Sequence, residues 1–356
     1  MVFGPDFFPN ALANAFTISY SCERRHKRRN PPSGNLRIQR GRFPPPAPLS
    51  RPGRRDICYT GEVPESSIPT PFVLARLGER GAEIPVALDA GGIAWDLRTL
   101  TADIDAAFWA KGGFAAVADG LENGSFAALG ADGLRVGAPV ARPGKVVCIG
   151  RNYRDHAAET GGQVESEPVI FMKTPYTVSG PYDDVMPLRG STTFDYEVEL
   201  AFVIASTASY LSKDEDPMDC VGGFCVANDL SDREMQFSHG GSQWDNGKNF
   251  PRSCPLGPWL VPYSAFSDYS SAVLELKVNG EIRQSEVVSN MVFDVPYLVR
   301  YLSNCMTLEP GDLVLTGTPS GVAYGMAEPK GYLRPGDVVE ASITNLGAQR
   351  LLVVQS

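Results

Sequence analysis

The sequence predicts an α+β fold that is predominantly β. Many short apolar runs have strand-like patterns, hairpin signals such as Asn279-Gly280 separate them, and few segments have helical spacing. The chain has 356 residues, 43% hydrophobic and 21% charged, which is typical of a globular protein of about two domains. No apolar run approaches the roughly 18–20 residues that span a bilayer, so we expect no membrane partner.

Residues 1–70 are predicted to be a basic, Pro- and Arg-rich extension without regular structure. Residues 1–55 hold eleven Lys or Arg and two acids, so they carry +9, and the rest carries −18 of the total −9. A Pro- and Arg-rich composition, without the regular spacing of apolar residues found in helices and strands, is typical of disorder. A transit peptide, a nucleic-acid-binding arm and an extension without a function are the open interpretations, and we favour the last. We expect the acidic body not to bind nucleic acid.

The seven cysteines are scattered, and they form neither a CxxC pair nor part of a zinc-binding set. We therefore expect reduced thiols and a cytoplasmic location.

Residues 71–140 are predicted to be a small N-terminal β-rich domain. Residues 72–97 alternate apolar and polar side chains between glycine turns, as in a short β-meander, and residues 104–121 have helical spacing. Residues 134–143 are the predicted linker into a main domain at 141–356. Since the small domain has no His and no paired acids on an apolar strand, we assign it a structural or assembly role.

Residues 194–204 of the main domain form an apolar strand that contains two acids. Because strand side chains alternate, Glu197 and Glu199 share one face, where repulsion and desolvation make them costly unless a divalent cation lies between them. The alternative is an edge strand with both acids in solvent. Asp229 ends another predicted strand, residues 221–229, and would supply a third oxygen ligand.

A candidate base follows the predicted strand at 145–150. Asn152 or Asp155 is the expected cap of a short helix on which His156 and Glu159 share a face, so that the carboxylate orients the imidazole. The alternative is a surface ion pair. The chain has only three histidines, which makes His156 the leading candidate for a base at neutral pH.

Three further segments carry candidate binding groups. Lys173 ends a predicted strand, where it would bind a substrate carboxylate or extend to the surface. A helix starting near residue 230, capped by Ser231 or Asp232, places Arg233 and Gln236 on one side as donors. Residues 313–321 end a strand in small residues that let backbone approach a ligand.

Five motifs occur in order: GRNYRDHAAE, FDYEVELAFVI, VANDLSDRE, GKNF followed by CPLGPWLV, and TGTPSG. By these motifs and their order, residues 71–356 resemble the fumarylacetoacetate hydrolase family. The resemblance implies a mixed β-roll catalytic domain, usually a homodimer, with Mg²⁺ or Mn²⁺ (Ca²⁺ as an alternative) held by Glu197, Glu199 and Asp229.

The resemblance also implies roles for individual residues. His156 and Glu159 correspond to a base dyad on a lid, and Lys248 to the family's active-site lysine. The predicted substrate-binding residues are Arg151, Tyr153, Lys173, Arg233, Gln236 and Thr318.

Two departures from the family pattern bear on the substrate. The segment 148–151 lacks the extra acidic ligand of the namesake enzyme, as in the acylpyruvate and diketo-sugar-acid hydrolases, and Pro251 stands where many relatives have Asp. We therefore predict a metal-dependent hydrolase that cleaves a C–C bond in a 2,4-dioxo acid and releases pyruvate. The alternatives are an oxaloacetate decarboxylase, a 2-oxo-enoate isomerase or tautomerase, and a non-catalytic metal-binding relative.

Overall fold

The structure is a computed structural model that describes residues 70–238 and 243–356. The predicted basic extension therefore lies outside the described residues, apart from Thr70. Strands dominate the described chain, as the sequence predicts. Within it, no helix has the length and hydropathy needed to cross a membrane.

The front sheet is an antiparallel meander at the start of the described chain. Its strands follow the order β1 (Phe72–Leu77), β2 (Ile84–Asp89), β3 (Ala94–Asp96) and β4 (Ala127–Leu129). The sequence predicts one helix in this region, but the structure has two, α1 (Ala106–Ala110) and α2 (Gly113–Glu122). They are separate because Gly112, before α2, and Gly113, its first residue, both take positive φ.

The central sheet is mixed, with only β16 and β5 running parallel. Its order is β13 (Val261–Pro262), β10 (Val221–Asn228), β9 (Val198–Ile204), β16 (Leu313–Leu315), β5 (Val146–Gly150) and β6 (Val169–Lys173). Every residue of β9 is buried. Alternate β9 side chains enter two separate apolar clusters, so this strand has core on both faces.

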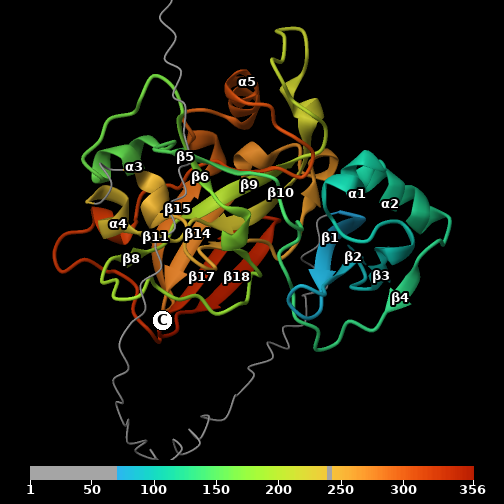
Figure 1. Ribbon diagram of the computed structural model, residues 1–356, viewed down its shortest axis with the longest axis horizontal. Helices are drawn as coiled ribbons and strands as arrows, with labels where there is room; N and C mark the ends of the chain where they lie inside the picture. Colours follow the sequence, from blue (N-terminus) through green and yellow to red (C-terminus); the bar gives the residue numbers. More distant parts are fainter. Residues whose placement is uncertain (1–69, 239–242) are drawn as a thin grey trace, which may run out of the picture. The chain divides into compact units, whose positions relative to one another are not determined.

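A third sheet, antiparallel, has the order β15 (Glu281–Val287), β14 (Val273–Val278), β17 (Val338–Ile343) and β18 (Gly347–Leu352). Two short pairs complete the strands: β8 (Phe194–Asp195) with β11 (Ser231–Asp232), and β7 (Val178–Ser179) with β12 (Cys254–Pro255). The remaining α-helices are α3 (Arg154–Glu159), α4 (Arg233–Phe237) and α5 (Val295–Cys305). In Figure 1, α3 and α4 lie on the opposite side of the central sheet from α1 and α2.

The front sheet shares its core with the rest of the described chain. Val73 of β1 and Leu200 of β9 belong to one apolar cluster, and Leu74 and Val203 belong to the other. The division into domains at residue 140 therefore stays a prediction.

Two local predictions were wrong. The expected strand 194–204 is interrupted at Tyr196 and Glu197, because the backbone N–H of Glu197 bonds to the Asn228 side chain instead of a neighbouring strand. Neither Asn152 nor Asp155 caps α3: its N-cap is Tyr153, without a side-chain bond, and Asn152 binds backbone of Phe293 and Thr316.

Candidate active site

The register of β9 and β10 brings three acids together. Ala227 pairs with Glu199, and the N–H of Asp229 donates to the carbonyl of Glu197 over 2.9 Å. One carboxylate oxygen from each of Glu197, Glu199 and Asp229 lies within 4.8 Å of the others. All three side chains are buried, so the edge strand with its acids in solvent is excluded.

Three cations surround two of these acids. The Nζ atom of Lys248 lies 2.6 Å from Oε2 of Glu197 and 2.7 Å from Oδ2 of Asp229. Arg233 Nη1 lies 2.7 Å from Oε1 of Glu197, and Lys173 Nζ lies 2.7 Å from Oδ1 of Asp229. Both carboxylates are thereby compensated on both oxygens.

Glu199 is different, because no cationic side chain of the described residues pairs with it. Within residues 70–238 and 243–356, its one hydrogen bond comes from the backbone N–H of Gly317, over 2.7 Å. Burial, together with repulsion from Asp229 and Glu197, raises the pKa of Glu199 well above its usual value. For Glu197, burial also opposes ionisation, but Lys248 and Arg233 outweigh it and hold the pKa of Glu197 below its usual range.

The residues present fit a divalent metal ion. Three converging carboxylates are the oxygen donors that Mg²⁺ and Mn²⁺ prefer, and Glu199 is a buried acid whose charge has no compensating partner among the described residues. With Asp195, which is buried and bound to Arg233, this group holds four acids and three bases. With all of these groups charged, the net charge is −1, so a bound divalent cation would favour the ionised form of Glu199, and the three carboxylates would be its ligands.

His156 and Glu159 lie on α3 and form the expected pair. The Nδ1 atom of His156 lies 2.9 Å from Oε1 of Glu159. Because a carboxylate only accepts, Nδ1 carries the proton and Nε2 is left as the acceptor. His156 is 7% exposed, so the pair is not a surface ion pair.

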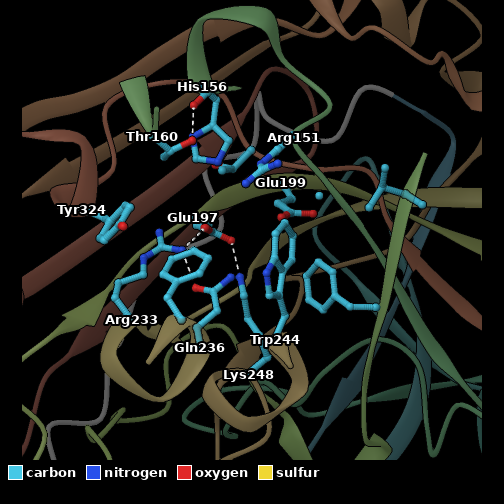
Figure 2. Close-up of a pocket in the computed structure, with 15 residues that line it drawn as sticks. Arg151, His156, Thr160, Glu197, Glu199, Arg233, Gln236, Trp244, Lys248 and Tyr324 are labelled. Atoms are coloured by element: carbon cyan, nitrogen blue, oxygen red, sulfur yellow. Dashed lines mark hydrogen bonds and ion pairs between the residues drawn. The ribbon is translucent and has the colours of Figure 1, made fainter. Parts of the chain in front are cut away.

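One cavity of about 160 Å³ is lined by His156, Glu197, Glu199 and Lys248, whereas Glu159 and Asp229 do not line it. Figure 2 shows the His156 ring on one side of it, Gln236 and Lys248 on the other, and Glu197 and Glu199 between them. Of the predicted substrate-binding residues, Arg151, Arg233, Gln236 and Thr318 line the cavity.

Tyr153 and Lys173, the other two predicted substrate-binding residues, do not line the cavity. Lys173 is 1% exposed, and its ammonium is taken up by Asp229 and the carbonyls of Leu230 and Lys248. It therefore does not extend to the surface. Tyr153 is 2% exposed and packs in the main core.

The sequence reasoning missed the aromatic wall of the cavity, which is formed by Phe171, Phe237, Trp244 and Tyr324. Trp244 packs against Phe171 and Phe237, and the Arg151 guanidinium lies 5.5 Å from the Trp244 ring centre. Gly150 makes room for this indole, because a Cβ there would lie 2.3 Å from it. No local sequence signal separates these rings from ordinary core aromatics.

Residues 145–354 match the family model described as fumarylacetoacetate (FAA) hydrolase C-terminal. The chain belongs to the fumarylacetoacetate hydrolase family. This match confirms the resemblance noted from the motifs.

Relatives within the family cover most of the described chain. The 2,4-didehydro-3-deoxy-L-rhamnonate hydrolase of Sphingomonas sp. (strain SKA58) is 40% identical over 277 residues, 77% of this chain and 93% of the relative. The fumarylacetoacetate hydrolase structure from Exiguobacterium antarcticum is 31% identical at a TM-score of 0.67, covering 80% of this chain and 100% of that one. The 2-hydroxyhepta-2,4-diene-1,7-dioate isomerase structure from Mycobacterium marinum is 29% identical at a TM-score of 0.61, covering 80% and 99%. These similarities support an enzyme, a hydrolase that acts on a keto acid.

Proposed function

We propose that this family member is a divalent-metal-dependent hydrolase that cleaves a C–C bond in a 2,4-dioxo acid and releases pyruvate. The observation that carries the proposal is that an oriented base, His156, faces the same cavity as the acids Glu197 and Glu199. Hydrolysis needs a group that activates water next to a group that binds the oxo acid, and this cavity has both.

The metal would be held by Glu197, Glu199 and Asp229. When bound, Mg²⁺ or Mn²⁺ supplies Lewis acidity toward the 2-oxo-acid end of the substrate. Arg233 supports binding at that end, because its Nη2 atom is buried, has no hydrogen-bond partner among the described residues, and belongs to a side chain that lines the cavity. A substrate carboxylate would satisfy this donor.

The chain's own residues provide the proton transfers. Glu159 keeps the proton of His156 on Nδ1, so Nε2 accepts a proton from water while the water oxygen bonds to C4 of the substrate. The C3–C4 bond then breaks, its electron pair stays on C3 as the enolate of pyruvate, and C4 becomes a carboxylic acid. Protonated His156 returns the proton to C3, and the Lys248 ammonium faces the developing negative charge. One substrate and one water thus give pyruvate and one acid.

The size of the cavity supports a small substrate. An apolar cavity of about 150 Å³ takes up benzene, so about 160 Å³ suits a chain of about six carbons. The Sphingomonas relative is named for a 3-deoxy sugar acid, which is of this class. We therefore place 2,4-diketo-3-deoxy sugar acids and short acylpyruvates first among candidate substrates.

The test is a substrate panel with the purified chain and Mg²⁺ or Mn²⁺: acylpyruvates, diketo-deoxy sugar acids and oxaloacetate. Pyruvate is measured with lactate dehydrogenase, and the second product is analysed by mass spectrometry in water labelled with oxygen-18. Hydrolysis places one labelled oxygen in the new carboxylic acid, and His156→Asn should abolish this. Turnover without label in the product would contradict the proposal.

The same panel separates the alternative activities. Some structural relatives are named as isomerases, which favours including a 2-oxo-enoate as a substrate. Isomerisation changes the ultraviolet spectrum without cleavage, and decarboxylation of oxaloacetate gives pyruvate and carbon dioxide without a second carboxylic acid. Either result alone, without hydrolysis of any dioxo acid, would replace the proposed reaction.

A further inference from the structure

The carboxylate of Glu159 makes two contacts, one with a residue of the same helix and one with a segment distant in sequence. Oε1 lies 2.9 Å from Nδ1 of His156 on the same short helix. Oε2 accepts a hydrogen bond of 2.9 Å from the backbone N–H of Gly321, which is 162 residues away in sequence. The second contact ties the helix that carries the base to the segment 321–325.

Gly325, in the same segment, leaves the space that the Glu159 side chain fills. A Cβ added to Gly325 would lie 2.7 Å from Oε2, 2.8 Å from Cδ and 2.9 Å from Cγ of Glu159. The φ angle of Gly325 is outside the left-handed region, so an alanine fits its backbone. The three nearest atoms all belong to Glu159, so a side chain at position 325 would collide with Glu159 and displace it.

The segment 321–325 is itself held firmly. Asp195, which is fully buried, accepts hydrogen bonds of 2.9 Å from the N–H groups of both Ala323 and Tyr324. The hydroxyl of Tyr196 donates to the carbonyl of Gly321 over 3.1 Å. Because Asp195 also accepts from Nε of Arg233 over 2.8 Å, the segment is tied to the side of the cavity where Arg233 lies.

We propose that Gly325 is a positioning residue: the segment 321–325 is the seat for Glu159, and through Glu159 it sets the orientation of His156. The catalytic part of this inference rests on the proposed function, in which His156 is the base. A side chain at position 325 displaces Glu159, and His156 then loses the acceptor that keeps its proton on Nδ1. The base is misdirected while the binding side of the cavity is left as it is.

The test compares Gly325→Ala with Gly130→Ala. Gly130 is exposed and has an ordinary φ, and a Cβ added there would have no atom within 4 Å, so it controls for the general effect of replacing glycine by alanine. Using the best substrate of the panel, we expect Gly325→Ala to lower kcat by about 10²-fold, as misplacement of a catalytic group by about 1 Å can do, with little change in KM. An unchanged kcat in Gly325→Ala would overturn the proposal.

A double-mutant cycle shows whether Gly325 acts through Glu159. In Glu159→Ala the atoms that would collide with the new Cβ are absent, so adding Gly325→Ala should change kcat and the melting temperature little, within about twofold for kcat. An equal loss in both backgrounds would show that Gly325 acts elsewhere. If Glu159→Ala itself leaves kcat unchanged, the base assignment of the proposed function fails.

A second readout needs no turnover. The chain has three histidines, so the ¹⁵N spectrum of histidine-labelled protein is simple, and His156→Asn assigns the signals of His156. We expect the Nδ1–H tautomer of His156 in the wild type and in Gly130→Ala, and a shift toward the Nε2–H tautomer in Gly325→Ala. The same tautomer in all three proteins would overturn the positioning role, whichever reaction the enzyme catalyses.

Discussion

Two groups of charged side chains in this molecule, buried or half-buried except for Arg80, differ in the balance of acids and bases. The front cluster lies around β1 and β2 and pairs three arginines with three acids: Arg76, Arg80, Arg135, Glu83, Asp103 and Asp183. The site cluster has three bases and four acids: Lys173, Arg233, Lys248, Asp195, Glu197, Glu199 and Asp229. In the front cluster every acid has an arginine, whereas in the site cluster Glu199 has no cation among the described residues.

The paired acid Asp183 of the front cluster and the unpaired acid Glu199 of the site cluster have pKa values shifted in opposite directions. Asp183 is partly buried, which opposes ionisation, but Arg135 and Arg80 lower the pKa of Asp183 to about 2. Burial and two neighbouring acids instead raise the pKa of Glu199. Balanced charges are expected to stabilise the fold, whereas an unbalanced buried acid beside a cavity supports the proposal that a cation and a substrate bind there.

The largest expected effect comes from removing the unbalanced acid. Glu199→Gln keeps the shape of the side chain, so it should lower turnover by at least about 10²–10⁴-fold through loss of a metal ligand, without loss of stability, since it removes repulsion. Turnover and urea unfolding are the measurements. Asp103→Asn in the front cluster is the matched control and should lower stability while leaving turnover intact. Full activity of Glu199→Gln would refute its role as a ligand.

Lys173→Met tests whether a buried base of the site cluster acts on Asp229 or on the substrate. Removing one partner of a buried ion pair costs about 3–5 kcal/mol, so the free energy of unfolding should fall by about that amount in the absence of metal. Chemical denaturation measures it. If stability is unchanged and only KM rises, Lys173 contacts the substrate after all.

The next largest expected effect is the stabilisation by added metal, which should depend on the site cluster and not on the front cluster. At a free Mg²⁺ or Mn²⁺ concentration of about 100 times Kd, binding stabilises the folded state by about 2.7 kcal/mol. In the wild type we expect the free energy of unfolding to rise by this amount when the metal is added, and a chelator should reverse the rise. In Glu199→Gln the rise should be absent. Asp103→Asn should keep the full rise, and an equal rise in Glu199→Gln would place the metal elsewhere.

The smallest effect is the acid dependence of the front cluster. The pKa of Asp183 falls from its ordinary value of 3.8 to about 2 on folding, so the ionised form favours the folded state. The contribution, about 2 kcal/mol, is fully present above pH 3.8 and is lost as the pH falls through about 2. Urea unfolding of the wild type and of Asp183→Asn between about pH 2 and 6 should give curves whose difference shrinks on acidification. If the difference in unfolding free energy between the two proteins does not depend on pH, the assigned role of Asp183 is wrong.

Some features of the site were predictable because they are local. A His and a Glu at i and i+3 of a short helix share a face once the helix forms, and Glu197 and Glu199, two positions apart, converge although Glu197 lies just before β9. Asp232 was one of two expected caps of α4, and its carboxylate does accept from the N–H of Met235. The ordered motifs then identified the family.

The sequence by itself therefore determined the predominantly β class, the family, and which acids and which histidine belong together. Only the tertiary structure decided that Lys173 compensates Asp229, that Tyr324 closes the cavity, and that Gly325 makes room for Glu159. The physical reason is distance along the chain. Periodicity and capping report on residues a few positions apart, whereas these contacts join segments far apart in the sequence, which meet only when the sheets pack.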